Sequence, residues 1–421
     1  MKQTKFLILI ALIGILIFSW ITRFYRLSQP ASYVFDEQYH VPAVRLINDG
    51  DQRAFEWWHG AIDGKSYHDW LHPPLAKYLQ GTAMNLWGDN AFAWRASSAI
   101  FGVMGVGLVF VLTQLVFQKP RVSLLAALLF SLDGLWLVQS RVAMNDVFLV
   151  VWLLLAAIVY LLYQQRRQLW LLPLIGLIFG LALATKWSAA FWLLGFLIWE
   201  VIKLVREKNS RLLPWLSFSW LLVPAAVYVL SFLPMFLQGK TLIDWWALQY
   251  QVLSYQVIGP ASHLYQSGPG QWLLNWRPVW YWTNYLGRNI YALNNPLLAW
   301  WELIALLLSL KVIIGKSASK LSNSLSWLIM LLLISLVPWL AITRISFYYH
   351  FLPATPVLAI LLAYWLDKLY LTNQPPSRKL IFWALIAALI WSFWLFFPLW
   401  VGLPVSSDLA EIFYFALPSW R

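Results

Sequence analysis

Long apolar runs alternate with short polar segments along most of the 421-residue chain. A helix needs about 20 apolar residues to cross the roughly 30 Å of hydrocarbon in a bilayer. Eleven runs come close to this length, and we predict them as transmembrane helices: 6–22, 91–115, 121–139, 144–163, 169–184, 187–205, 212–236, 296–314, 324–342, 349–367 and 379–400. The pattern therefore predicts an all-α polytopic membrane protein, a single transmembrane domain over residues 1–421.

Two of the polar segments are long, and we expect them to lie on the same side of the membrane. The first covers residues 23–90 and the second residues 237–295. With the N-terminus inside, the inner side receives sixteen Lys and Arg residues and three acids, so the whole net charge of +13 lies on that face. Such an excess follows the positive-inside rule. We predict a cytoplasmic N-terminus in the plasma (inner) membrane, with both long loops and the C-terminus outside.

Composition narrows the class of protein further. The chain is 61% hydrophobic and 11% charged, whereas soluble domains carry about 25% charged residues. The one-sided placement of the basic residues argues against nucleic-acid binding, which the net charge alone would suggest. Because the chain has no cysteine, it has neither disulfides nor thiolate metal sites. The first apolar run lacks a small-residue cleavage site, so we expect an uncleaved anchor.

The first candidate site is the acid pair Asp36–Glu37, directly after the first predicted helix. Neighbouring carboxylates repel each other, so one of them can hold its proton more tightly than a free acid. Such a carboxylate can take a proton from an attacking hydroxyl, as a general base does. The same two residues also suit the start of a helix, with Asp36 as its N-cap. Both interpretations stay open from this motif alone.

A second polar motif runs from His68 to Lys77 and contains His72 before two prolines. Two prolines in series favour an extended turn that can lead into a helix. This turn would either present His72 near the membrane surface or simply begin the helix. A divalent metal on His68, Asp69, His72 and His40 is conceivable, but no standard ligand spacing supports it, and no metal is predicted.

Four cations stand at the predicted outer ends of helices: Arg95, Arg141, Lys186 and Arg344. A cation inside the membrane costs about 2.5–3.5 kcal/mol on insertion scales, so it usually has a function. Any one of these side chains could snorkel to the interface. Four at one depth, on the side of the acid pair, favour a phosphate site, because Arg offers a fork and Lys a point charge to phosphate oxygens.

Aromatic residues are concentrated in the two long loops. Ten tryptophans lie there, and most are expected to form an interfacial belt, while the others could line a groove for a lipid or a sugar: Trp57, Trp58, Trp70, Trp87, Trp245, Trp246, Trp272, Trp276, Trp280 and Trp282. In the stretch from His263 to Tyr281, polar groups between aromatics suit either sugar binding or an amphipathic interfacial helix. The segment from Arg344 to Pro353 completes the outer set.

Together these features favour glycosyl transfer from a membrane-anchored lipid-phosphate donor. A polyprenyl phosphate is a good leaving group once its charge is neutralised, and Asp36 would take the proton of the attacking hydroxyl. Two alternatives remain: a related transferase with another sugar or a lipid or glycan acceptor, and a transporter or flippase of lipid-linked sugars. A transporter is expected to carry ionisable residues near the bilayer midplane. The predicted helices are almost clean of charge there, which favours an enzyme.

The motifs resemble, in the same order, those of the protein O-mannosyltransferase family, which has the C-type glycosyltransferase (GT-C) fold. The resemblance covers nearly the whole chain and rests on these features: Asp36-Glu37, His72-Pro73-Pro74-Leu75, Arg95, Ser140-Arg141 with Asp146, Thr185-Lys186-Trp187, the stretch from His263 to Tyr281, and Arg344 through Pro353 with His350. It implies about eleven transmembrane helices and interfacial helices in the first outer loop.

The resemblance also implies transfer of mannose, with inversion, from a polyprenyl-phosphate mannose to Ser or Thr of secreted or membrane proteins. It places the acidic pair on Asp36 and Glu37, and we favour Asp36 as the base with Glu37 orienting the substrate. It places the family's first-loop arginine on Arg95 and its phosphate-contacting lysine on Lys186, and we expect these two residues to bind substrate together with Arg141, Asp146, His72, Arg344 and His350. The second loop, 237–295, is too short for the lectin-like insert of eukaryotic members, which implies a short, bacterial-type enzyme. The expected partners are the lipid donor, the protein acceptor and the bilayer, with no nucleic acid.

Overall fold

The computed structural model describes residues 2–59, 67–208, 210–257, 262–315, 319–370 and 375–420. Parts of both predicted outer loops, and Lys316 among the predicted inner cations, lie outside the described residues. The chain forms two compact units. Unit 1 comprises Met1–Arg26, Ala99–Arg141 and Ser262–Arg421, and unit 2 comprises Leu27–Ser98 and Val142–Ala261. Each unit is therefore assembled from segments far apart in the sequence.

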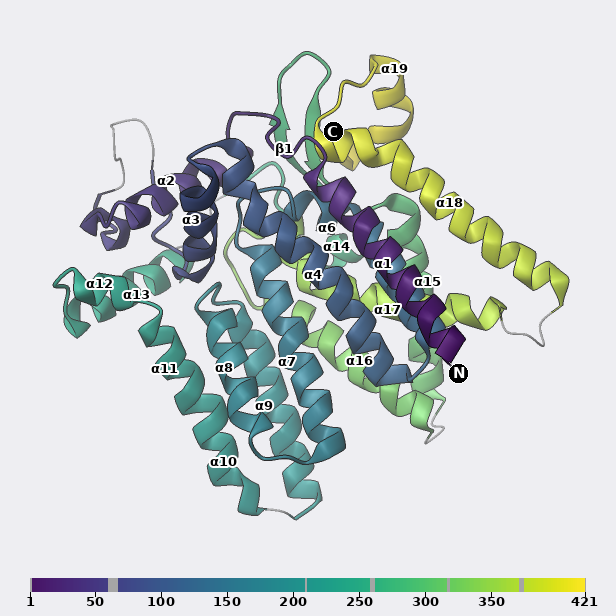
Figure 1. Ribbon diagram of the computed structural model, residues 1–421, viewed down its shortest axis with the longest axis horizontal. Coiled ribbons are helices and arrows are strands. Elements are labelled where there is room, and N and C mark those ends of the chain that lie inside the picture. The colour runs from purple at the N-terminus through teal and green to yellow at the C-terminus, as the bar shows by residue number, and fades with distance from the viewer. Residues whose placement is uncertain are drawn as a thin grey trace. The chain divides into compact units, whose positions relative to one another are not determined.

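Unit 1 is mostly helical and contains one β-hairpin (Figure 1). Its elements are α1 (Lys2–Phe24), most of α4 (Ala91–Phe117), α5 (Pro120–Ser131), α6 (Gly134–Gln139), α14 (Pro269–Leu273), β1 (Val279–Thr283), β2 (Asn289–Ala292), α15 (Pro296–Ile314), α16 (Lys320–Leu336), η4 (Val337–Leu340), η5 (Tyr348–Ala354), α17 (Thr355–Tyr370), α18 (Pro376–Val401), α19 (Ser407–Leu409), η6 (Ala410–Tyr414) and η7 (Pro418–Trp420). Helix α17 packs against α5 and α15 at the centre of this unit. The antiparallel hairpin pairs Val279 with Ala292 and Thr283 with Asn289.

Unit 2 combines a group of long helices with the shorter helices of the two long loops (Figure 1). Its elements are α2 (Glu37–Asn48), η1 (Gln52–Phe55), α3 (Leu75–Trp87), the start of α4, α7 (Asp146–Arg166), α8 (Leu171–Leu183), α9 (Ala189–Arg206), η2 (Ser210–Leu212), α10 (Leu213–Ser217), η3 (Phe218–Leu222), α11 (Val223–Leu230), α12 (Leu233–Leu237) and α13 (Leu242–Val257). Helix α8 packs against both α7 and α11.

The helical segments follow the predicted apolar runs closely. Among the described residues, eight helices are long and apolar enough to cross a membrane, and α5 and α8 are shorter apolar helices. The prediction of a mostly helical membrane protein is confirmed. The number eleven and the orientation of the termini stay predictions. The run predicted over 121–139 is divided into α5 and α6, because Asp133 caps a new helix by accepting a hydrogen bond from the backbone N–H of Trp136 at 2.8 Å.

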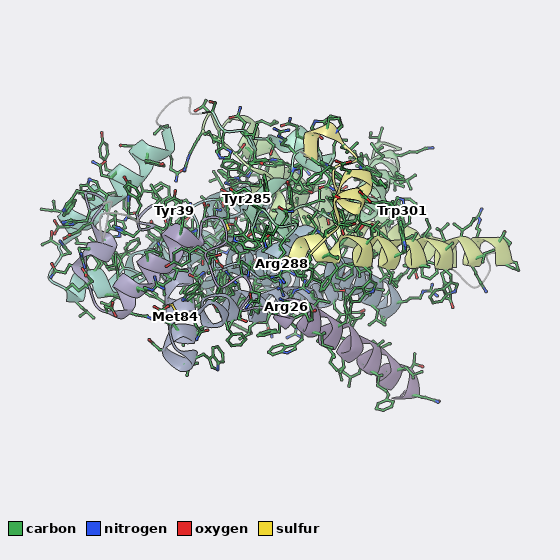
Figure 2. All side chains as sticks on the ribbon, turned by 90° about the horizontal axis from the view of Figure 1, so that it is seen from above. Arg26, Tyr39, Met84, Tyr285, Arg288 and Trp301 are labelled. Atoms are coloured by element: carbon green, nitrogen blue, oxygen red, sulfur yellow. The ribbon has the colours of Figure 1, made fainter. Side chains whose placement is uncertain are left out.

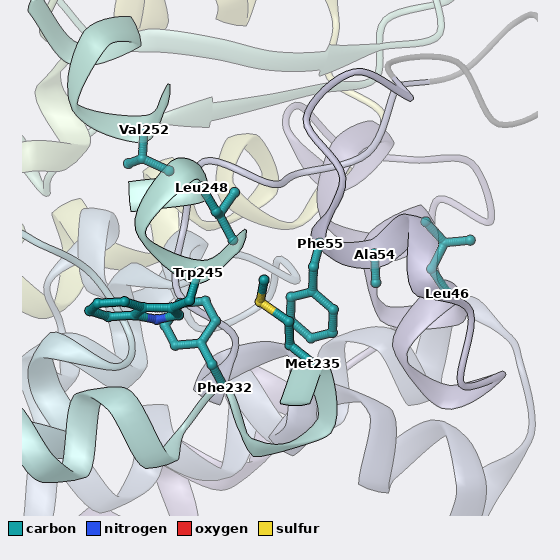
Figure 3. Packing of buried hydrophobic residues seen from close by; sticks show 8 residues of the cluster. All are labelled: Leu46, Ala54, Phe55, Phe232, Met235, Trp245, Leu248 and Val252. Carbon is teal, nitrogen blue, oxygen red and sulfur yellow. The ribbon is translucent and has the colours of Figure 1, made fainter. Parts of the chain in front are cut away.

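The two long loops pack on each other within unit 2. A cluster of buried apolar residues joins η1 and α2 of the first loop to α13 of the second loop and to α12, which precedes that loop (Figure 3): Leu46, Ala54, Phe55, Phe232, Met235, Trp245, Leu248 and Val252. The side chains of Phe55 and Met235 point toward each other in this cluster. Figure 2 shows Tyr39 on α2 and Met84 on α3, the two helices that frame the first loop. Burial of apolar surface contributes about 25 cal/mol per Å², so this cluster helps to hold these segments together.

Candidate active site

Asp36 occupies the N-cap position of α2, but among the described residues its side chain does not make the capping hydrogen bond. The helix starts because the backbone N–H groups of Tyr39 and His40 donate to the Asp36 carbonyl at 2.9 and 3.0 Å. Phe35, just before it, has φ of +50°, so the chain turns sharply into the helix. The start of α2 therefore positions Asp36, but its carboxylate does not cap the helix.

Burial, the largest cause, raises the pKa of the Asp36 carboxyl to about 6. Asp69 and Asp146 raise this pKa further, whereas His40 and Lys186 lower it. A carboxyl whose pKa lies near the working pH suits general-base catalysis. This raised pKa is compatible with the prediction that Asp36 is the base.

Glu37 has different surroundings, since its carboxylate is fully buried and bound on both oxygens. Arg95 donates to Oε1 from Nε and to Oε2 from Nη2, both at 2.7 Å. The backbone N–H groups of Ala143 and Val34 donate to the same carboxylate at 2.9 and 2.8 Å. This pairing ties the start of α2 to the start of α4 and to the segment before α7.

The other N–H groups of Arg95 are bound as well. Nη1 donates to the carbonyls of Leu27 and Pro30 at 3.1 and 2.8 Å, and Nη2 also donates to the Ser32 carbonyl at 3.0 Å. A guanidinium has five N–H donors, and each has a protein acceptor here. In this conformation Arg95 holds the segment before Asp36 rather than offering its fork to a phosphate.

Lys186 and Asp146 form a second ion pair, with Nζ 2.7 Å from Oδ1. Asp146 is the first residue of α7, and Lys186 lies in the turn after α8. Both side chains are largely buried, at 10% and 4% exposure. The backbone N–H of Leu75 donates to the Ala184 carbonyl at 3.0 Å, which fixes the start of α3 against this turn. The structure thus brings Lys186 and Asp146 within electrostatic range of Asp36.

The polar motif from His68 to Lys77 centres on Asp69. Its Oδ1 lies 2.9 Å from His72 Nδ1, and its Oδ2 lies 3.0 Å from both His40 Nδ1 and Lys77 Nζ. Burial opposes ionisation of Asp69, but His72, Lys77 and His40 together hold the pKa of its carboxyl well below the usual value. The two prolines begin α3 as expected, with Pro74 at its N-cap position.

The ligand atoms of His40, Asp69 and His72 lie within 4.8 Å of one another, a spacing at which a metal ion could be held. His68 is not part of this group. The Lys77 ammonium contacts Asp69 Oδ2 at 3.0 Å and donates to the His72 carbonyl at 2.7 Å. The Lys77 ammonium therefore already neutralises the Asp69 carboxylate. Because a second cation there would meet this positive charge, we interpret the group as a set of ion pairs rather than a strong metal site.

An apolar pocket of about 570 Å³ opens within unit 2, and Trp187, the residue after Lys186, lines it. It is lined by residues of α8, α9, η3, α11 and α13, including Trp187, Trp220, Tyr228, Trp245, Trp246 and Tyr250. Three of its polar side chains are linked, since Trp187 Nε1 donates to the Tyr228 hydroxyl at 2.7 Å and that hydroxyl donates to Gln249 Oε1 at 2.6 Å. Of the two interpretations for the loop tryptophans, the groove therefore applies to Trp245 and Trp246. The pocket was not predicted from the sequence, because its walls come from three separate stretches of the chain, 183–193, 220–228 and 245–253.

The remaining predicted site residues, Arg141, Arg344 and His350, belong to unit 1. Arg141 Nη1 donates to the carbonyls of Thr22 and Arg23 at 3.1 and 2.6 Å. His350 lies in an aromatic setting, with its ring centroid 4.2 Å from that of Trp339 and 6.2 Å from that of Trp272. Arg344 is half-buried in the segment before η5.

Two hydrogen bonds join the second outer loop to the Arg344 segment in unit 1. The backbone N–H of Ser267 donates to the Ser346 carbonyl at 2.9 Å, and the Ser346 hydroxyl donates to the Ser267 carbonyl at 2.8 Å. The stretches His263–Tyr281 and Arg344–Pro353, both predicted to lie on the outer side of the membrane, therefore contact each other.

The sequence matches two family models and several known proteins over most of its length. Residues 71–233 match a family model for dolichyl-phosphate-mannose-protein mannosyltransferases, and residues 241–420 match the model of the C-terminal four-helix membrane region of protein O-mannosyltransferases. A polyprenol-phosphate-mannose–protein mannosyltransferase from Mycolicibacterium smegmatis is 25% identical over 95% of this chain and 90% of its own. A counterpart from Corynebacterium glutamicum is 23% identical over 97% and 92%.

Solved structures of low sequence identity show the same fold. The protein O-mannosyltransferase Pmt1–Pmt2 complex from S. cerevisiae, bound to its sugar donor, is similar with a TM-score of 0.80, at 14% identity over 97% of this chain and 92% of that chain. ArnT from Cupriavidus metallidurans, bound to undecaprenyl phosphate, gives a TM-score of 0.60 at 15% identity, over 90% and 63%. The expected GT-C fold is confirmed, and the chain belongs to the protein O-mannosyltransferase family of glycosyltransferases.

Proposed function

We propose that this protein transfers mannose from a polyprenyl-phosphate mannose to Ser or Thr hydroxyls of exported proteins, with inversion at the anomeric carbon. The observation that carries the proposal is the setting of Asp36, a carboxyl with a pKa of about 6 in electrostatic range of the Lys186–Asp146 pair. One end of such a site can take a proton, and the other carries a cation for a phosphate. Relatives over nearly the whole chain are named for this donor and reaction.

In the proposed reaction the acceptor hydroxyl attacks the anomeric carbon from the side opposite the phosphate. Its proton passes to the Asp36 carboxylate as the new carbon–oxygen bond forms. The bond to the phosphate oxygen breaks, and its electron pair leaves with the polyprenyl phosphate. Lys186 stabilises the charge that develops on that oxygen, because an ammonium in a water-poor site acts strongly on a nearby anion. Asp146 keeps Lys186 in place at 2.7 Å.

The buried ion pair of Glu37 and Arg95 has a positioning role in this proposal. Arg95 holds the carbonyls of Leu27, Pro30 and Ser32, which precede Asp36, and Glu37 follows Asp36 directly. The backbone before and after Asp36 is therefore held in place. We also propose that Arg141, His72, Arg344 and His350 bind substrate.

The apolar pocket lined by Trp187 supplies a place for the first isoprene units of the donor. Its volume of about 570 Å³ lies in the usual range of ligand pockets, and its lining is almost wholly apolar. A phosphate near Lys186 would put the attached prenyl chain beside Trp187, the next residue in the chain. We place the enzyme in the plasma membrane, with the N-terminus in the cytoplasm and the site on the outer face.

Transfer by the purified protein tests this function directly. We expect detergent-solubilised protein to move mannose from a polyprenyl-phosphate mannose onto a Ser/Thr peptide, detected by mass spectrometry, with inverted anomeric configuration by NMR. Donors with the same lipid but another sugar, and lipid or glycan acceptors, should react much more slowly. Transfer of a different sugar, or to a non-peptide acceptor in preference, would replace this proposal by a related transferase.

A lysine variant tests the donor end of the site. Lys186→Gln should raise the KM for the donor and lower kcat/KM by about 10- to 100-fold, since one charged hydrogen bond to phosphate is worth roughly 1.5–3 kcal/mol. The matched control is Lys240→Gln, which removes another lysine paired with a carboxylate, that of Glu56. An equal loss of kcat/KM in both variants would show that Lys186 does not bind the donor phosphate.

A further inference from the structure

Asp36 is only partly exposed at the start of α2, and the proposed reaction leaves one requirement open. After each transfer the base carries the proton of the acceptor hydroxyl, and it must lose that proton before the next turnover. The charged and titratable groups in electrostatic range of Asp36 are His40 on α2, Asp69 in the first loop, Lys186 after α8, Asp146 on α7 and Tyr39 on α2. Of these, imidazole is the group that best carries protons between partners near neutral pH.

His40 stands one helical turn after Asp36. Its backbone N–H donates to the Asp36 carbonyl at 3.0 Å, so the two side chains lie on the same side of the start of α2. The His40 side chain is only 5% exposed, and its Nδ1 lies 3.0 Å from Asp69 Oδ2. A carboxylate on one nitrogen orients the ring and leaves the other nitrogen, Nε2, to exchange a proton.

His72 continues this arrangement toward water. Its Nδ1 lies 2.9 Å from Oδ1 of the same Asp69, and its ring centroid is 5.6 Å from that of His40. Its side chain is 25% exposed, whereas those of His40 and Asp69 are 5% and 4% exposed. One buried carboxylate thus holds two imidazoles in series, the inner one beside the base and the outer one reaching solvent.

We propose that His40 and His72, held by Asp69, form a proton exit that regenerates Asp36 between turnovers. The inference rests on the proposed function, because it takes Asp36 as the base. Protonated Asp36 gives its proton to His40, and the resulting imidazolium is stabilised by Asp69. The proton then passes to His72 and from there to water, which leaves Asp36 ionised and both histidines neutral. Asp69 is a positioning residue in this scheme and does not touch the substrate.

The experiment compares the first turnover with steady-state transfer, since only the latter needs the exit. In His40→Ala we expect single-turnover transfer close to that of the wild type, with the steady-state rate lower by about 10-fold or more. Imidazole added to the buffer should restore part of that rate, because it can replace the missing ring. His72→Gln should lower the steady-state rate in the same direction. The control His59→Ala removes another histidine paired with a loop carboxylate, that of Glu56 at 2.6 Å, and should behave as the wild type.

Three results would overturn the exit. Equal loss of the first and later turnovers in a His40→Ala protein of wild-type unfolding temperature would mean that His40 serves the chemical step instead. Steady-state rates unchanged in both His40→Ala and His72→Gln would show that the proton leaves by another path. Loss of wild-type activity in EDTA, with recovery on adding a divalent cation, would assign the cluster to a metal. Absence of any transfer by the wild type would instead refute the proposed function, so the two failures are distinguishable.

Discussion

Arg95 and Glu37 form a fully buried ion pair with two hydrogen bonds of 2.7 Å, although 58 residues separate them in the sequence. The pair fixes the turn that carries Asp36, because Glu37 is its neighbour and Arg95 also binds three carbonyls of the preceding segment. A buried pair of this kind contributes little net stability compared with apolar side chains, yet removal of one partner leaves the other charge uncompensated. The adjacent acids Asp36 and Glu37 thus have sharply different surroundings.

Removal of the arginine should therefore destabilise the fold. For Arg95→Met we expect a loss of about 3–5 kcal/mol in the free energy of unfolding, because the Glu37 carboxylate is left buried without its partner. Equilibrium unfolding in mixed detergent and SDS measures this change. The control Arg45→Met breaks an exposed two-pronged pair with Asp89, for which about 0–1 kcal/mol is expected. Similar losses in the two variants would contradict the proposed anchoring role.

The pKa of Asp36 predicts the pH dependence of transfer. A base must be ionised to work, so kcat/KM should rise with pH and level off above about 6, the pKa that burial gives this carboxyl. Asp36→Asn should lower the rate by about 10²–10⁴-fold, since the amide cannot take a proton. A pH series of initial rates with a peptide acceptor measures both effects. A rate that is flat between pH values below and above 6, or an active Asp36→Asn, would assign the base elsewhere.

The same variant should stabilise the folded protein. The folded state raises the pKa of Asp36 from 3.8 to about 6, so it holds the proton more tightly than the unfolded chain. Ionisation therefore costs folding free energy, fully above the folded pKa and not at all well below 3.8. Asp36→Asn removes this cost, and we expect a higher unfolding temperature near neutral pH that converges on the wild type as the pH falls through 6 toward 4. An unchanged or lower unfolding temperature near neutral pH would contradict it.

The helices were predictable from the sequence because the bilayer imposes a length and a composition on each of them. The run predicted over 91–115 is α4 (Ala91–Phe117), and the run over 379–400 is α18 (Pro376–Val401). The hairpin of β1 and β2 was missed, because its strands lie in an aromatic loop whose pattern also suits an interfacial helix. The π-turn η3 was missed as well, since apolar periodicity does not reveal a local change in helical pitch.

The candidate site was predictable in its residue types but not in its pairings. Asp36, Lys186 and Asp146 were identified from their order along the chain, and the structure brings them together in unit 2. The partner of Arg95 was not predicted, because an arginine at a membrane interface fits a phosphate as well as a buried carboxylate. Lys77 was likewise missed as a partner of Asp69, since a lysine inside an apolar helix start is usually expected to reach water.

Neighbouring residues of α11 offer a test of the apolar pocket. Ala225 lines the pocket, whereas Ala226 beside it does not. Ala225→Trp should fill part of the space and raise the KM for a long-chain donor severalfold, with little effect on a donor carrying one or two isoprene units. Ala226→Trp should leave both donors unaffected, and transfer assays with the two donors measure the difference. Equal changes in KM for the two variants, or for the two donors, would show that the prenyl chain does not bind in this pocket.

Close packing of α8 against η3 gives the last prediction. A Cβ built on Gly176 would collide with the backbone carbonyl oxygen of Ser219, and one on Gly180 would collide with the Val227 side chain. Since backbone cannot yield as a flexible side chain can, Gly176→Ala should cost about 1–3 kcal/mol by overpacking. It should also reduce transfer, because η3 and α11 line the pocket together. The control is Gly14→Ala in α1, where a Cβ meets nothing within 4 Å, and alanine there should leave the unfolding temperature unchanged or raise it slightly. Comparable unfolding temperatures for Gly176→Ala and Gly14→Ala would show that α8 and η3 do not pack this closely.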